Sequence, residues 1–239
     1  GFARAAARGR GARELKQRTE LRRRQQAEAA ARELEAVTRP RPTPLTWGLI
    51  ALCVGIAVLT QLGQNQQVVG SLIIIDPRRP FEVTAFSLFG QRILWLGLPW
   101  HEPWRLITPV LVHFDGWHIL FNMLWLRDLG RIIEGRHGAR HLLSFVLVSG
   151  ILSNIAQYQI AQNPLFGGMS GVVYGLLGMI WVRGRLDPRA GYGLSRFTVQ
   201  AMLLWMAIGF ISPRLAMANW CHLFGLLVGV VWGFVGARR

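Results

Sequence analysis

Six long apolar runs constrain the fold of this chain more than any other feature of its sequence. A helix that crosses a bilayer needs about 20 mostly apolar residues. We therefore expect six spanning helices, at about 45–63, 116–134, 140–159, 170–184, 197–212 and 217–236. The predicted fold class is an all-α polytopic membrane protein, built as a bundle of six transmembrane helices.

The basic residues flank these apolar runs. Lys and Arg number 27 against 12 Asp and Glu, which gives a net charge of +15 in a chain that is 51% hydrophobic. Arginines beside apolar segments are typical of the cytoplasmic loops of membrane proteins. Nucleic-acid-binding proteins instead gather their basic residues on one face together with base-reading motifs. The charge therefore indicates membrane topology, and we expect the lipid bilayer and not a nucleic acid as its partner.

The positions of the arginines predict which ends of the helices face the cytoplasm. Both termini are expected there, because the clusters at the two ends and after the second and fourth runs all fall on one side. These clusters are Arg22, Arg23 and Arg24; Arg131, Arg136 and Arg140; Arg183, Arg185, Arg189 and Arg196; and Arg238 and Arg239. The chain is thus divided into a basic, mobile arm (1–43), a six-helix domain (44–237) and a short cytoplasmic tail (238–239).

The connection between the first two runs is unusually long. It covers about 64–115 and contains SLIIIDPRRP and the aromatic stretch FEVTAFSLFGQRILWLGLPWHEPW. Prolines and charges interrupt it too often for a spanning helix. We expect an interfacial loop with short amphipathic pieces.

Polar side chains gather near the outer ends of three predicted helices. With the amino terminus inside, the second, fourth and sixth helices begin on the outer side, and their early residues include His118, Asn122, Ser170 and His222. Polar groups inside a membrane are costly and tend to mark a functional site. One serine or histidine alone is more simply explained by a bond within or between helices, but four residues at one level favour a site.

Glycine spacing predicts that the fourth and sixth helices lie in close contact. Small residues four apart let two helix backbones approach each other. They are Gly171 and Gly175 after Ser170, and Gly225, Gly229 and Gly233 after His222. Such contact would bring the Ser170 hydroxyl within hydrogen-bond reach of a His222 nitrogen, and a serine paired with a histidine is an activated nucleophile.

Acyl transfer also needs hydrogen-bond donors for the negative charge that develops on the substrate oxygen. His118 and Asn122 are one turn apart on a single helix face, and the N–H of Ser170 lies at a helix start, where amides lack helical partners. A metal site built from His113, His118 and His222 is the competing interpretation. The sequence lacks HExxH and has no carboxylate near His222, so we expect no metal.

The motifs together resemble those of the rhomboid intramembrane serine proteases, of the bacterial GlpG type. The resemblance covers about 45–236. It depends on GMSG with Tyr174 four residues after the serine, on His222 followed by Gly225 and Gly229, on HFDGWHILFN, and on the pair Trp104–Arg105.

This resemblance implies a Ser–His dyad in a water-filled cavity that opens to the outer face. Ser170 would be the nucleophile and His222 the general base and later the general acid. Tyr174 would pack against the His222 ring, and Gly168 would permit the turn that lowers the serine. The oxyanion site would consist of His118, Asn122 and the Ser170 amide.

The resemblance also assigns supporting roles. Arg105 and Glu134 would make polar contacts that hold the first loop and the inner end of the second helix. The fifth helix and the segment ISPRLAM would form a mobile substrate gate. Pro109 differs from the family pattern, since GlpG-type proteins often carry an additional histidine there.

The expected activity is hydrolysis of a peptide bond in or next to a transmembrane helix of another membrane protein, without a cofactor. The expected location is a bacterial inner membrane, with the active site open to the periplasmic side. Two alternatives remain. One is an inactive rhomboid-like scaffold that binds single-pass helices, and the other is a small transporter, although Asp128 and Glu134 trace no path across the bilayer.

Overall fold

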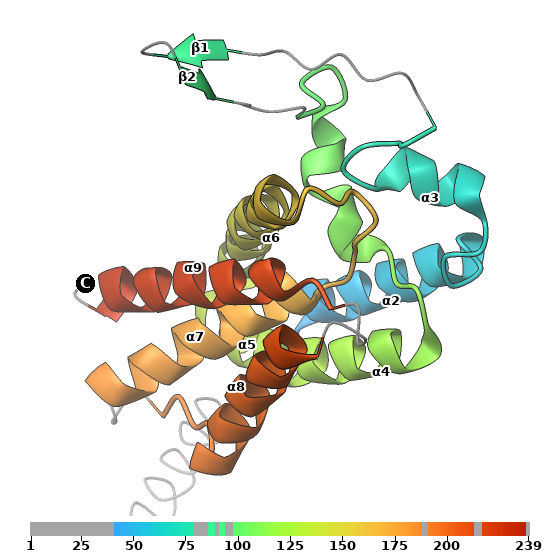
Figure 1. Cartoon of the computed structure of the whole chain (residues 1–239). Coiled ribbons are helices and arrows are strands. Elements are labelled where there is room, and N and C mark those ends of the chain that lie inside the picture. The colour runs from blue at the N-terminus through green and yellow to red at the C-terminus, as the bar shows by residue number, and fades with distance from the viewer. Residues whose placement is uncertain are drawn as a thin grey trace, which may run out of the picture. The chain divides into compact units, whose positions relative to one another are not determined.

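The computed structural model describes residues 41–78, 86–88, 91–93, 98–187, 191–212 and 217–237 (Figure 1). The chain divides into two units, Gly1–Arg41 and Pro42–Arg239, and the second carries the fold. Several predictions fall outside the described residues. They concern the basic arm up to residue 40, Arg79, Arg189, the tail 238–239, positions 213–216 of ISPRLAM, and parts of the aromatic stretch in the first loop.

Helices make up most of the described chain, and each predicted apolar run coincides with a helical path. They are α2 (Pro44–Leu59), α4 (Gly116–Trp125), α5 (Arg131–His137), α6 (Ala139–Ala161), α7 (Ser170–Leu186), α8 (Arg196–Ile211) and α9 (Asn219–Ala237). A π turn at Leu126–Gly130 joins α4 to α5. The run predicted at 116–134 is therefore helical throughout, with one change of pitch.

The helices differ in their capacity to cross a membrane. Among the described helices, two are long and apolar enough, Ala139–Ala161 and Asn219–Gly236. Helices α2 and α8 are apolar but have 16 residues each, about 24 Å at 1.5 Å per residue, which is less than the hydrocarbon thickness of about 30 Å. Helix α2 ends four residues before the predicted boundary, because Gln61, Leu62 and Gly63 adopt positive φ. The count of six spans stays a prediction.

The first loop contains more regular structure than its sequence predicts. It forms α3 (Gln66–Leu72), the strands β1 (Phe86–Leu88) and β2 (Gln91–Ile93), and two 3-10 turns, Pro103–Leu106 and Thr108–Leu111. The strands pair antiparallel, with Phe86 opposite Ile93. The described part of the domain is otherwise helical, so the predicted all-α class holds, but the prediction did not include this short hairpin. Aromatic and β-branched residues favour strand pairing, whereas the prediction weighed only the prolines and charges of the segment.

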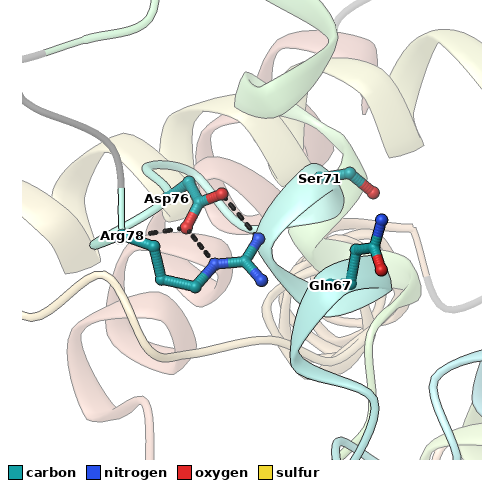
Figure 2. Close-up of a pocket in the computed structure, with 4 residues that line it drawn as sticks. All are labelled: Gln67, Ser71, Asp76 and Arg78. Carbon is teal, nitrogen blue, oxygen red and sulfur yellow. Dashed lines mark hydrogen bonds and ion pairs between the residues drawn. The ribbon is translucent and has the colours of Figure 1, made fainter.

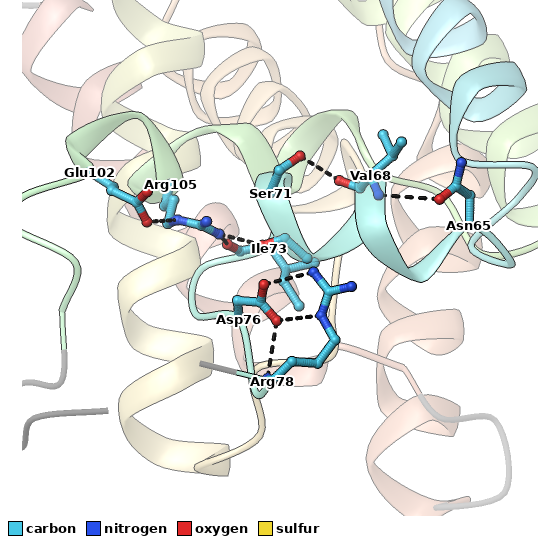
Figure 3. A network of polar contacts seen from close by, with 9 residues as sticks. Asn65, Val68, Ser71, Ile73, Asp76, Arg78, Glu102 and Arg105 are labelled. Atoms are coloured by element: carbon cyan, nitrogen blue, oxygen red, sulfur yellow. Dashed lines mark hydrogen bonds and ion pairs between the residues drawn. The ribbon is translucent and has the colours of Figure 1, made fainter. Parts of the chain in front are cut away.

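A buried arginine holds the first loop together. The Arg105 side chain is 2% exposed, and its Nη1 donates to the carbonyl oxygens of Gly70 at 2.6 Å and Ile73 at 2.9 Å. Its Nε donates to the carboxylate of Glu102 (Figure 3). These bonds satisfy carbonyls at the end of α3 that lack helical donors. Arg105 thus connects α3 to the 3-10 turn at Pro103–Leu106.

A buried glutamate holds the start of α2. Both carboxylate oxygens of Glu134, on α5, are used. One accepts from the N–H of Leu45 at 2.8 Å, and the other accepts from the N–H and the hydroxyl of Thr46, each at 2.7 Å. The first amides of a helix have no partner within it, and a negative charge there is stabilising. Glu134 therefore contacts the beginning of the first helix.

Helix α7 lies at the centre of the core. Every residue from Gly171 to Ile180 is buried, and the helix contacts both α6 and α9. Figure 1 shows α9 next to α7, with α8 leaning away from the pair. Ser170 is the first residue of this central helix.

Candidate active site

The backbone before Ser170 requires glycine. Gly168 has φ +111°, and a Cβ built on it would lie 2.6 Å from the His118 ring. Its N–H donates to the carbonyl oxygen of Pro109 at 3.0 Å. Pro109, which departs from the family pattern, thus still binds the segment that leads into Ser170, through its main-chain carbonyl. A side chain at position 168 would meet both strain and a steric clash.

The Ser170 hydroxyl and the His222 imidazole form a hydrogen bond. Ser170 Oγ and His222 Nε2 are 2.9 Å apart, and His222 is 4% exposed. The sequence predicts this contact. Nδ1 of His222 is buried and has no hydrogen-bond partner among the described residues. In the described part of the chain, the arrangement is therefore a pair of side chains without a third hydrogen-bonding member.

Glycines on both helices make this contact possible. A Cβ on Gly225 would overlap the carbonyl oxygen of Gly171, and a Cβ on Gly229 would overlap that of Gly175. The two backbones touch at positions one turn apart on each helix. No side chain larger than hydrogen fits between them, so this contact sets the distance between Ser170 and His222.

Tyr174 lies against the imidazole. The centroids of the Tyr174 and His222 rings are 4.8 Å apart, with planes tilted by 32°. The Tyr174 hydroxyl donates to the carbonyl oxygen of Met202, on α8, at 2.9 Å. The ring that covers His222 is therefore itself held by a neighbouring helix.

The two predicted oxyanion residues lie on the first turns of α4. The Asp115 carboxylate accepts the N–H of His118 at 2.7 Å and so caps this helix. The His118 ring lies beside Gly168, two residues before Ser170. The Asn122 amide donates one hydrogen bond to the His118 carbonyl at 2.8 Å. An amide group has two N–H donors, so Asn122 retains capacity for a second acceptor.

His113 is a supporting residue that the sequence identifies only as a possible metal ligand. Its Nδ1 lies 3.1 Å from the Leu111 carbonyl, and its Nε2 accepts from the N–H of Met169 at 3.5 Å. Burial lowers the pKa of His113 to about 4, so the ring is neutral near pH 7 and its Nε2 can accept. His113 supports the residue directly before Ser170.

Polar side chains of α6 bind both α9 and the first loop. Gln157 Oε1 accepts the N–H of Cys221 at 3.1 Å, and Asn154 Nδ2 donates to the carbonyl of Leu106 at 2.9 Å. The amide of Cys221 lies in the first turn of α9, where helical acceptors are missing. Sequence spacing gives no signal for these bonds, because each joins residues far apart in the chain.

A surface recess lies on the first loop. Gln67, Ser71, Asp76 and Arg78 line it, and the Arg78 guanidinium donates to both carboxylate oxygens of Asp76, at 2.8 and 2.7 Å (Figure 2). None of these residues belongs to the Ser170–His222 site. The recess is a feature of α3 and the turn after it.

A family model of the rhomboid domain matches residues 100–239, more than half of the chain. The chain belongs to the rhomboid family. Rhomboid-family proteins are usually serine intramembrane proteases that act on membrane-protein substrates within the bilayer. The matched residues contain both Ser170 and His222, and the family together with the apolar helices indicates an integral membrane protein.

Proposed function

We propose that this rhomboid-family protein is an active intramembrane serine endopeptidase of the bacterial GlpG type. The observation that carries the proposal is the 2.9 Å contact between Ser170 Oγ and His222 Nε2. A serine hydroxyl bonded to a histidine nitrogen has a base ready to take its proton. The predicted roles of the residues follow from this pair.

The reaction would proceed through an acyl-enzyme. Ser170 Oγ attacks the carbonyl carbon of the scissile peptide, and His222 Nε2 takes the hydroxyl proton. The C–N bond then breaks, and His222 gives that proton to the leaving amine. Water, deprotonated by His222, hydrolyses the ester and restores Ser170. This scheme needs neither a metal nor an organic cofactor.

Donors near Ser170 would stabilise the negative oxygen of the tetrahedral intermediate. The candidates are the N–H of Ser170 at the start of α7 and the side chains of His118 and Asn122. One well-placed donor is typically worth about 3–4 kcal/mol of transition-state stabilisation. The side chain of His118 beside Gly168 and the second amide N–H of Asn122 support this role.

The membrane topology in this proposal is inferred from the apolar runs and the arginine positions of the sequence. We infer six transmembrane helices with both termini in the cytoplasm of a bacterial cell, and a site that opens to the periplasmic side of the inner membrane. Substrates would be transmembrane proteins with helices that unwind readily, because breaking backbone hydrogen bonds in hydrocarbon is costly. The alternative function is a scaffold that binds such helices without cutting them. The hydrogen-bonded serine and histidine favour the protease.

Cleavage in liposomes tests the proposal. The wild-type protein, Ser170→Ala and the control Ser144→Ala are reconstituted with a fluorescent single-pass substrate. Ser144 is exposed on α6, and its hydroxyl bonds only the Arg140 carbonyl of its own helix among the described residues. We expect cleavage by wild type and by Ser144→Ala, and none by Ser170→Ala. Cleavage by Ser170→Ala would reject the nucleophile, and binding without cleavage by wild type would favour the scaffold.

Labelling with a small fluorophosphonate provides a second test that does not depend on the substrate. Wild type should form a covalent adduct on Ser170, identified by mass spectrometry of the modified peptide. His222→Ala should label far more slowly, because the base is missing. Equal labelling of wild type and His222→Ala would contradict the assigned role of the histidine.

A further inference from the structure

Helix α8 is attached to the rest of the domain along one narrow side. It buries only Val199, Met202 and Gly209, while Phe197 and Ile211 at its ends are 79% and 80% exposed. It meets α9 over a much smaller contact than α7 does. This helix therefore depends on a small number of interactions for its position.

Two of these interactions are hydrogen bonds to the backbone of α8. The Tyr174 hydroxyl donates to the carbonyl oxygen of Met202 at 2.9 Å, and Asn219 Nδ2 donates to that of Gly209 at 2.8 Å. Met202 and Gly209 are seven residues apart, about two helical turns, so their carbonyls lie on one face. The two bonds therefore hold α8 at two points along that face, about two turns apart.

The donors of both bonds also lie near His222. Tyr174 covers the imidazole ring, and Asn219 is the first residue of α9, three residues before His222. Since His222 Nδ1 has no hydrogen-bond partner within the described ranges, the ring is oriented by Ser170 at one nitrogen and by Tyr174 over its face. Tyr174 touches the imidazole itself, whereas Asn219 can act on it only through the first turn of α9.

We propose that Tyr174 and Asn219 are positioning residues that make the orientation of His222 depend on the docking of α8. The proposal rests on the proposed protease function and adds a regulation of that site. With α8 docked, Met202 and Gly209 fix both donors and the imidazole points at Ser170. With α8 displaced, both acceptor carbonyls are lost, Tyr174 and the first turn of α9 gain freedom, and the dyad loses its working geometry.

A simpler role for the two bonds leads to the opposite result. If they only hold α8 closed, removing one would ease the entry of a substrate and leave Ser170 as reactive as before. KM would then fall or kcat would rise. If the bonds orient His222, removing one lowers the reactivity of Ser170 even towards a small reagent.

The test compares Tyr174→Phe with the matched control Tyr158→Phe. Tyr174→Phe keeps the ring over His222 and removes only the hydroxyl. Tyr158 lies on α6 and packs with the separate cluster around Ile74, Ile75 and Phe166. For Tyr174→Phe we expect fluorophosphonate labelling and kcat to fall about 3- to 10-fold, the effect of one lost hydrogen bond, with KM within about 2-fold by the same reasoning. Tyr158→Phe should match wild type.

Asn219→Ala gives an independent second test at the other bond. Rates are expressed per folded molecule, determined by size-exclusion chromatography and thermal unfolding. Slower labelling in Asn219→Ala, with KM unchanged, supports the proposal. Wild-type labelling rates in both folded variants, or a rise in kcat in either, overturn it. A failure of the protease function looks different, because wild type itself would then not be labelled at Ser170.

Discussion

The contact between α7 and α9 and the attachment of α8 are two opposite solutions to helix packing in one small domain. Helices α7 and α9 touch backbone to backbone, with glycine facing glycine at Gly171–Gly225 and Gly175–Gly229. Helix α8 meets the same pair through a few side chains and two hydrogen bonds. In a membrane, helices associate by close packing and by polar bonds, since lipid is as apolar as their side chains.

The difference separates the parts of the domain that can move from those that cannot. Backbone contact allows no sliding, because any shift of α9 against α7 would drive carbonyl groups into each other. Side-chain contacts can be broken and remade. Ser170 and His222 are carried by the rigid pair, whereas their support by Tyr174 extends to the loosely attached helix.

Of the substitutions that test the difference between the α7–α9 contact and the attachment of α8, Gly229→Leu should have the largest effect. A side chain at this position meets the carbonyl oxygen of Gly175, and backbone atoms cannot move aside as a side chain can. The destabilisation should exceed the roughly 1–3 kcal/mol typical of overpacked cores. We expect little folded protein in detergent by size-exclusion chromatography and no fluorophosphonate labelling. A folded, labelled variant would show that the helices do not touch as described.

Gly225→Ala should have a smaller effect, with Gly55→Ala as its matched control. The added methyl group at 225 meets the carbonyl of Gly171, whereas position 55 on α2 has no atom within 4 Å of the new Cβ. We expect a loss of about 1–3 kcal/mol at 225 and a gain of about 0.5–1 kcal/mol at 55, because alanine favours a helix over glycine. Equal thermal unfolding temperatures for the two variants would contradict the backbone contact.

Met202→Ala should weaken the attachment of α8 while leaving its backbone carbonyl in place. Met202 is 5% exposed and belongs to the core cluster. We expect a loss of about 1–2 kcal/mol, at the lower end for a deleted core side chain, because in lipid only packing is lost. Limited proteolysis should then cut near α8 sooner than in wild type. Unchanged protease resistance would mean that α8 is held more firmly than its contacts indicate.

Phe210→Ala should have the smallest effect. Phe210 meets Trp220 edge to face, with centroids 5.4 Å apart, and such pairs contribute about 0.5–1.5 kcal/mol. Trp205→Ala, also on α8 and 54% exposed, is the control and should change thermal stability by less than about 0.5 kcal/mol. An effect at Trp205 as large as that at Phe210 would place the attachment of α8 elsewhere.

Sequence patterns predict the helices and the central contact because the physics behind both is local. Apolar runs and glycine spacing lie within single segments, so α6, α7 and α9 and the approach of Ser170 to His222 follow from them. The end of α2 does not follow, because Gln61 and Leu62 adopt positive φ without glycine. Nothing in their side chains marks that turn.

The supporting residues are harder to predict because their partners are distant in sequence. His113 binds Met169 across 56 positions and Gln157 binds Cys221 across 64. A buried histidine or glutamine has the same local pattern whether it binds a metal, a backbone amide or nothing. Only the tertiary structure selects the partner. The structure gives the contacts of these residues, but their roles in the oxyanion site and in supporting the dyad stay predictions.

The π turn at Leu126–Gly130 gives the path from α4 to α5 one more residue than a regular helix needs. Each residue of an α-helix rotates the direction of its side chains by about 100°. In the π turn the added residue is instead taken up by a wider turn, so deleting a single residue here would restore a regular helix and leave Glu134 facing Leu45 and Thr46 and His118 and Asn122 facing as before. The wider turn thus lets the path from α4 to α5 hold an additional residue while one end still lies beside Gly168 and the other still binds the start of α2.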